Sequence, residues 1–209
     1  MIDSFKEILL TWRKGPGSRR YVVGSIKPNG SFKYELRGVE DAKKEGFTGY
    51  PGLSINSDFQ DSNLFSKRII SSERTDTSNL FNFWEIDPIY KDNYLYMLAM
   101  TQGKMSNDNF EFLASFRPFK GLSFVTDIAG LSHSEFDINC LSVGDKLTYK
   151  LDKNNPVDNE AVLILKDNQK VGYIKKGHHK VFHMQKSENL ILTVKAISNG
   201  ELYVRVNYQ

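Results

Sequence analysis

The chain has 209 residues, of which 40% are hydrophobic and 12% aromatic. This composition is sufficient for a buried core and excludes a disordered protein. The net charge of +3 permits a nucleic-acid partner but does not require one. The single cysteine, Cys140, excludes an internal disulfide and a multi-cysteine zinc site, which fits a reducing cytosol.

The sequence contains no recognisable membrane or export segment. No apolar run approaches the ~18–20 residues that span a bilayer. The first ten residues include two acids, Asp3 and Glu7, and lack the basic start of a signal peptide. We therefore expect a cytoplasmic protein with no membrane partner.

Residues 1–118 mix helical and strand patterns. Apolar side chains at helical spacing predict a helix over residues 2–10. Alternating apolar residues on both sides of an Asn-Gly pair predict a hairpin of residues 21–26 and 31–36. Helical spacing returns in residues 63–70, 78–84 and 94–100. Residues 110–113 are predicted to form a strand. We expect this mixed α/β module to end in the loop at residues 118–121.

Residues 119–209 have a different pattern, with short strands, one short helix at residues 175–185 and a second Asn-Gly hairpin turn at Asn199-Gly200. The predicted strands are residues 124–130, 146–151, 161–165, 171–174, 190–197 and 202–206. Short strands at this density within about 90 residues predict a small, partly open β-barrel of the OB or SH3 kind, with one or two helices. The whole chain is therefore predicted to be of the α+β class, with two domains.

Two coupled motifs carry a family resemblance. Residues 154–162 read NNPVDNEAV and contain the pattern N-P-x-D-x-x-A-V, and residues 171–176 read VGYIKK and lead into the predicted helix. On these motifs residues 119–209 resemble a HIRAN domain, the module found in SNF2-type replication-fork remodellers and in many bacterial proteins. The resemblance implies a small β-barrel that engages nucleic acid and catalyses no reaction.

The HIRAN resemblance also implies a ligand, the 3′ end of single-stranded DNA, and roles for individual residues. Asn155 and Asp158 correspond to polar groups near the terminal nucleotide, Tyr173 to a ring, and Lys176 to a phosphate contact. Such lysines neutralise phosphate, and a ring that stacks on a base contributes ~1–3 kcal/mol. The full set of predicted nucleic-acid contacts is Lys153, Asn155, Asp158, Tyr173, Lys175, Lys176 and His133.

The sequence departs from the nucleic-acid-binding members of the family at several contacts. Their Arg-Tyr-Tyr run corresponds here to Ser132, His133 and Ser134, and their N-P-Y-D tyrosine corresponds to Val157. Two or three stacking or phosphate contacts are therefore missing. Residues 166–186 are nevertheless rich in basic charge, because they contain six lysines and a single aspartate.

The first half bears a fainter resemblance to the small amino-terminal subdomain of HipA-type kinases, which are toxins of bacterial toxin–antitoxin systems. The residues that carry it are 23–26, 30–35, 51–53 and 64–69. The sequence has no catalytic loop of a kinase. The resemblance implies a module that contacts a protein partner. The alternative function is therefore a regulatory accessory factor of a HipA-like system, in which the barrel is a scaffold.

Metal binding and catalysis are the remaining possibilities. His179 and His183 are four residues apart, a spacing that can hold zinc from one face of a helix, but a solvated basic face also explains both rings. Cys140 and His133 form the only conceivable Cys–His pair, and we expect Cys140 to be buried. Phosphate-binding and nucleophile-elbow motifs do not occur. We therefore expect no enzyme, no cofactor and no metal site.

Overall fold

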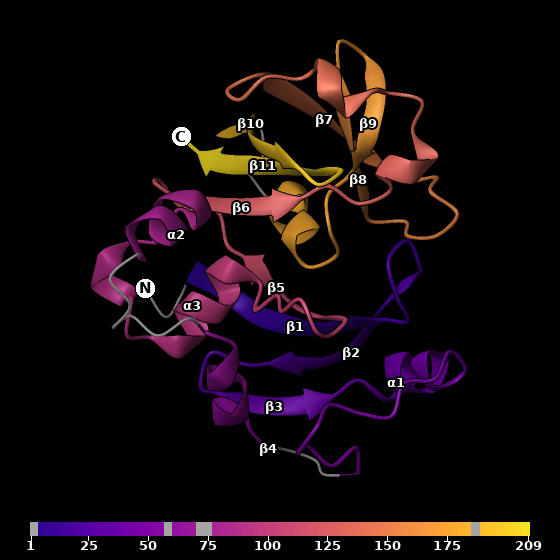
Figure 1. The fold of residues 1–209 in the computed structure, drawn as a ribbon, viewed down its shortest axis with the longest axis vertical. Helices are drawn as coiled ribbons and strands as arrows, with labels where there is room; N and C mark the ends of the chain where they lie inside the picture. Colours follow the sequence, from indigo (N-terminus) through magenta and orange to yellow (C-terminus); the bar gives the residue numbers. More distant parts are fainter. Residues whose placement is uncertain (1–3, 57–59, 70–76, 185–188) are drawn as a thin grey trace. The chain divides into compact units, whose positions relative to one another are not determined.

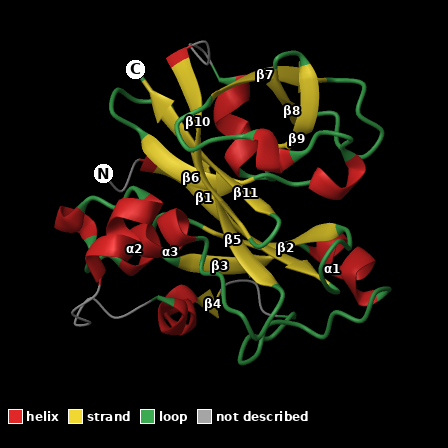
Figure 2. Cartoon of the chain, turned by 45° about the horizontal axis from the view of Figure 1, so that its top comes forward, coloured by secondary structure: helices red, strands yellow, loops and turns green. Residues whose placement is uncertain are grey.

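The computed structural model describes residues 4–56, 60–69, 77–184 and 189–209 (Figure 1). The chain divides into two compact units, of which the first is Met1–Asn82 with Ile86–Ser115 and the second is Phe83–Glu85 with Phe116–Gln209. Each unit contains one sheet, and the helices are short (Figure 2). The predicted α+β class is confirmed. Within the described ranges, no helix combines the length and the apolar character that crossing a membrane requires.

The first unit is built on a five-stranded sheet of order β4-β3-β2-β1-β5. Its strands are β1 (Phe5–Arg13), β2 (Arg20–Ile26), β3 (Ser31–Tyr34), β4 (Gln60–Asp61) and β5 (Phe110–Phe116). Its helices are α1 (Leu36–Lys43), η2 (Ser62–Arg68), α2 (Thr77–Trp84), η3 (Pro88–Tyr90) and α3 (Tyr94–Thr101), where η marks a 3-10 helix. The predicted hairpin is confirmed as the antiparallel pair β2–β3, and the predicted helices near residues 78 and 94 are confirmed as α2 and α3.

The predicted helix over residues 2–10 is wrong, because this segment forms β1. Ile8 and Leu10, two residues apart, are both completely buried, as expected for one face of a strand. The strand pairs with β2 from Ile8 to Arg13, with a shift in register after Leu10. Pairing with β2 on one side and with the distant β5 on the other thus overrides the helical spacing of the apolar residues. The sequence analysis also missed α1 and assigned its first residue to a strand.

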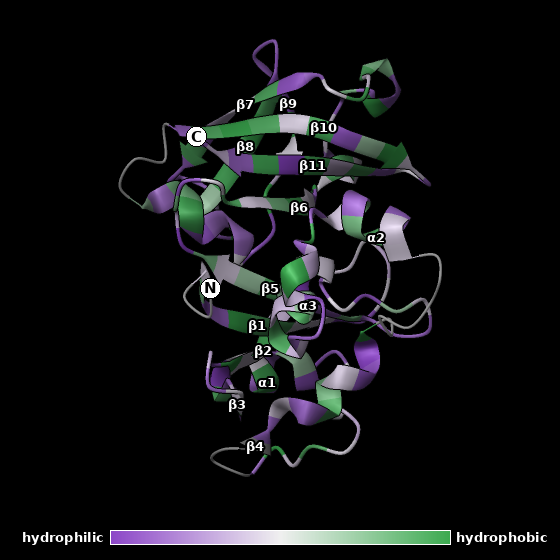
Figure 3. Ribbon diagram, turned by 90° about the vertical axis from the view of Figure 1, so that its left-hand side faces the viewer, coloured by the Kyte–Doolittle hydropathy of each residue, from purple (hydrophilic) through white to green (hydrophobic). Residues whose placement is uncertain are grey.

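The second unit contains a six-stranded sheet of order β6-β11-β10-β7-β8-β9. The strands are β6 (Ser123–Asp127), β7 (Lys146–Asp152), β8 (Ala161–Lys166), β9 (Gln169–Tyr173), β10 (Leu190–Ser198) and β11 (Glu201–Tyr208). The 3-10 helices are η4 (Leu131–His133), η5 (Ile138–Cys140) and η6 (His178–His183). Buried and more exposed residues alternate along β11, which shows one apolar face (Figure 3).

The second unit has two hairpin turns, and the one at Asn199-Gly200 lies where the sequence predicts it. Asp167 and Asn168, between β8 and β9, have φ values of 48° and 64°. Asn199 and Gly200, between β10 and β11, have φ values of 51° and 75°. Positive φ at both central residues is typical of the turns that match the twist of paired strands. The local turn chemistry therefore fixes both hairpins.

The first and last strands of this sheet are joined at one point. Ala129, just after β6, forms an isolated bridge with Tyr173 in β9, and each residue donates a backbone hydrogen bond of 2.8 Å to the other. Gly172 makes the approach possible, because a Cβ atom there would lie 2.5 Å from Cγ2 of Ile128 and 2.6 Å from the carbonyl oxygen of Ala129. The predicted barrel is thus an antiparallel sheet that curls until its edges meet at this bridge.

We predict that Gly172→Ala lowers the free energy of unfolding by ~1–3 kcal/mol, because the added methyl group forces Ala129 away from Tyr173. Urea denaturation of the full chain, followed by circular dichroism, measures the change. Gly15→Ala is the control, since a Cβ atom at Gly15 would have no neighbour within 4 Å. Equal stability of the two variants would show that the bridge tolerates the methyl group.

Candidate nucleic-acid interface

The N-P-x-D motif forms the loop between β7 and β8, and two of its side chains order that loop. Oδ1 of Asn155 accepts hydrogen bonds from the backbone nitrogens of Val157 at 2.9 Å and Asp158 at 3.1 Å. Oδ1 of Asp158 accepts one from the backbone nitrogen of Glu160 at 3.0 Å. These bonds replace backbone pairing in the turn. Asn155 and Asp158 are therefore structural residues of the loop.

Tyr173 is connected to this loop through Asp152. The Tyr173 hydroxyl donates a hydrogen bond of 3.1 Å to Oδ2 of Asp152, and the Asn155 amide donates one of 3.2 Å to the same oxygen. Nζ of Lys170 lies 5.0 Å from the centroid of the Tyr173 ring, within the range of a cation–π contact. The ring is half-buried, so its position is fixed while part of it remains accessible.

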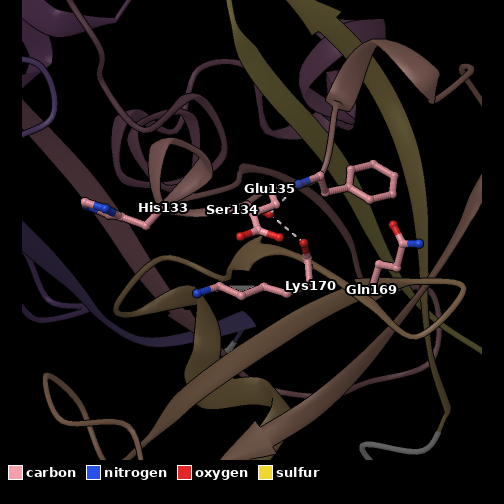
Figure 4. Close-up of a pocket in the computed structure, with 6 residues that line it drawn as sticks. His133, Ser134, Glu135, Gln169 and Lys170 are labelled. Atoms are coloured by element: carbon pink, nitrogen blue, oxygen red, sulfur yellow. Dashed lines mark hydrogen bonds between the residues drawn. The ribbon is translucent and has the colours of Figure 1, made fainter.

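Lys170, which contacts the Tyr173 ring, also lines a hollow of about 560 Å³ (Figure 4). Its lining residues are His133, Ser134, Glu135, Phe136, Gln169 and Lys170. Ser134 donates a hydrogen bond of 2.5 Å to the carbonyl oxygen of Lys170, which ties η4 to β9. His133 is exposed, and its ring points away from the other labelled side chains.

The predicted lysines do not share one environment. Lys153 and Lys176 are exposed, and Nζ of Lys176 lies 3.7 Å from Oδ2 of Asp158. Lys175 is only 6% exposed and forms a buried ion pair with Asp127 at the end of β6. Lys175 is therefore buried and does not lie among the surface contacts, where the sequence predicted it. Adjacent lysines point to opposite sides of an extended segment, and the sequence does not reveal which one points inward.

Sequence reasoning missed Lys170 and Asp152, although both lie in contact with a predicted residue. Lys170 belongs to the lysine-rich stretch of residues 166–186, so that stretch was the available signal. Asp152 ends β7 and offered no local signal, because its link to Tyr173 joins residues 21 positions apart. Pairing between distant strands creates this part of the surface.

A second group of polar side chains gathers around η6. Nε2 of His179 lies 3.6 Å from Oδ2 of Asp158, and Glu160 forms an ion pair with Lys180. Burial of the ring lowers the pKa of His179 to about 4, and the hydrogen bond from Lys180 lowers the pKa of Glu160. The prediction of a solvent-exposed ring is therefore wrong for His179, which is 1% exposed. It is correct for His183, which is exposed.

Cys140 is exposed, so the prediction of a buried thiol is wrong. It ends η5, a single turn that begins when Asp137 accepts a hydrogen bond of 2.9 Å from the backbone nitrogen of Asn139. This turn keeps the segment at the surface, and burial resumes only at Leu141. Local capping thus overrides the apolar character of the segment.

We predict that Lys175→Ala lowers the free energy of unfolding by ~3–5 kcal/mol, because it leaves the buried carboxylate of Asp127 without its ion-pair partner. The neighbouring Lys176→Ala is the matched control and should change stability by at most ~1 kcal/mol, since Lys176 is 49% exposed. Urea denaturation measures both variants. Similar small losses in the two variants would show that Lys175 does not stabilise the interior.

Comparison with known proteins adds a similarity of fold. No protein-family model and no curated protein matches the chain. Similar solved structures include the HIRAN domain of human HLTF, with 17% identity and a TM-score of 0.36 over 41% of this chain and 74% of that one. A Lactobacillus plantarum protein has 16% identity and a TM-score of 0.35 over 42% and 91% of the two chains. The first of these is a HIRAN domain, the family that the motifs in residues 154–162 and 171–176 resemble. Neither description names a HipA-type kinase, so that resemblance stays a prediction. Similarity of this degree supports no conclusion about ligands.

Proposed function

We propose that the second unit binds single-stranded nucleic acid, with the 3′ end of DNA as the ligand that its motifs imply. The observation that carries the proposal is the accessible Tyr173 ring with the Lys170 ammonium 5.0 Å from its centroid. A ring and a cation side by side suit a nucleotide, which offers a flat base and a negative phosphate. We call the surface formed by Lys153, Asn155, Asp158, Lys170, Tyr173 and Lys176 the Tyr173 surface.

The ring of Tyr173 is suited to stacking because its orientation is fixed before a ligand arrives. Its backbone is held by the bridge to Ala129, and its hydroxyl is held by Asp152. A side chain that is already ordered loses little conformational entropy when a base stacks on it. The contact therefore retains most of the ~1–3 kcal/mol that base stacking contributes.

The lysines of the Tyr173 surface supply the phosphate contacts. Lys153, Lys170 and Lys176 are all exposed. Lys153 lies in the turn that follows β7, Lys170 lies on β9, and Lys176 lies in the loop that follows β9. Each phosphate contact of this kind releases a counterion and adds ~0.7 to the slope of log affinity against log salt for a single strand. Binding through this surface is therefore expected to weaken as the salt concentration rises.

The acidic groups on the same surface favour the end of a strand over its interior. Asp158 places a carboxylate 3.7 Å from the Lys176 ammonium. A carboxylate repels phosphate but accepts a hydrogen bond from a hydroxyl group. A free 3′ hydroxyl satisfies that acceptor, whereas a 3′ phosphate brings two like charges together. The arrangement thus supports a preference for a 3′ hydroxyl terminus.

We predict that Tyr173→Ala weakens binding to a short single-stranded DNA by roughly 5- to 150-fold, the equivalent of ~1–3 kcal/mol of stacking. Fluorescence anisotropy at two salt concentrations measures the affinity. Lys176→Ala should weaken binding and reduce the salt slope. Lys146→Ala is the control, because this exposed lysine lies at the opposite end of β7 from Lys153.

Oligonucleotides that differ only at the 3′ terminus separate end recognition from general attraction. We expect the 3′ hydroxyl form to bind more tightly than the 3′ phosphate form, and Asp158→Asn to reduce that difference. Equal binding of both forms would overturn the preference for ends and leave a basic surface. Absence of binding by the wild-type protein at low salt would overturn the proposed function and direct attention to a protein partner.

A further inference from the structure

Three side chains that can each bind a metal ion meet between the β7–β8 loop and η6. They are Asp158 and Glu160 from the loop and His179 from η6, and each offers a ligand atom that lies within 4.8 Å of the others. The loop is ordered by the hydrogen bonds of Asn155 and Asp158, so both carboxylates project from a fixed backbone. No local pattern in the sequence indicates this group, because Glu160 and His179 lie 19 positions apart.

The ring of His179 indicates that this group binds a ligand. Its side chain is 1% exposed, and neither ring nitrogen has a hydrogen-bond partner among the residues that the structure describes. Buried polar atoms are nearly always paired, and one left without a partner costs ~1–3 kcal/mol. The nitrogen Nε2 faces Asp158 at a distance too long for a hydrogen bond. A ligand between the two groups would satisfy both.

The spacing of these atoms suits a metal ion. Ligands that lie ~2.0–2.1 Å from a tetrahedral zinc ion stand roughly 3.3 Å from one another. Nε2 of His179 and Oδ2 of Asp158 are separated by 3.6 Å, close to that distance. A small closure of the loop toward η6 would therefore bring both atoms into coordination.

We propose that Asp158, Glu160 and His179 form a binding site for a divalent transition-metal ion of the zinc class. One imidazole and two carboxylates are a donor set that such ions accept, whereas Mg²⁺ and Ca²⁺ prefer oxygen donors alone. Three protein ligands leave a fourth position for water or an anion. The site lies in the β7–β8 loop and η6 and requires no other part of the chain.

Charges around the site are compatible with an incoming cation. Lys180 pairs with Glu160, and these side chains are 36% and 45% exposed. The 49% exposed Lys176 lies 3.7 Å from Oδ2 of Asp158. An ion pair of this exposure contributes at most ~1 kcal/mol, so a metal ion displaces the ammonium group at little cost. Neither ring nitrogen of His179 has a hydrogen-bond partner among the described residues, so a ring lone pair is available to a metal ion.

His183 supports the site without belonging to the three ligands. Its Nε2 lies 2.8 Å from the backbone oxygen of Glu160, and its ring centroid is 5.9 Å from that of His179. This contact holds the backbone beside the Glu160 carboxylate. Groups that fix the position of a metal ligand in this way raise affinity.

Titration of the full chain, free of a histidine tag, with Zn²⁺ in a calorimeter tests the site. We expect one equivalent to bind, and Co²⁺ to give a visible absorption band when it takes the same place. His179→Ala and Glu160→Gln should each weaken binding at least tenfold. Asp167→Asn is the matched control, because this exposed aspartate lies in the β8–β9 turn, where asparagine tolerates the positive φ.

Two outcomes would overturn the proposal. One is the absence of stoichiometric binding by the wild-type chain. The other is binding that Glu160→Gln leaves unchanged, since the 45% exposed Glu160 can be replaced without disturbing the fold. Glu160→Gln therefore decides the question even where His179→Ala unfolds the protein. The titration contains no nucleic acid, so its result is independent of the proposed function.

Discussion

The backbone bridge between Ala129 and Tyr173 is the interaction on which the second unit depends. It joins the two edges of a six-stranded sheet, and it exists because Gly172 has no side chain to separate them. The chain then continues from Ala129 through Gly130 into η4, which carries His133 to the hollow beside Lys170. The bridge therefore brings η4, with His133, close to the strand that carries Lys170 and Tyr173.

A buried ion pair reinforces the same junction. Asp127 ends β6, and Lys175 lies two residues beyond Tyr173, so the pair connects the strands that the bridge joins. Two buried charges stabilise a fold less than their attraction suggests, because both lose hydration. They do penalise any other register strongly, since a shift of one residue would leave each charge alone. The ion pair thus favours the observed register of the closed sheet over shifted registers.

Local chemistry accounts for the features that the sequence predicted correctly. The Asn199-Gly200 turn and the hydrogen bonds of Asn155 and Asp158 depend on residues within a few positions, so their patterns are visible in the sequence. Several wrong predictions concern pairing over long distances: β1 forms a strand because it pairs with β5, which is distant in the sequence, as well as with β2. The inward direction of Lys175 and the meeting of Glu160 with His179 have the same cause. Burial and contact across strands decide them, and neither leaves a local pattern.

Positions 172 and 173 differ in how freely they can change. The bridge uses only backbone atoms of Tyr173, so its side chain can be exchanged without loss of either hydrogen bond. Gly172 has no such freedom, because any β-carbon collides with the opposing chain. The closure of the sheet and the proposed stacking contact are therefore carried by different, neighbouring residues. A substitution at position 173 can alter the proposed interface while the closure of the sheet stays intact.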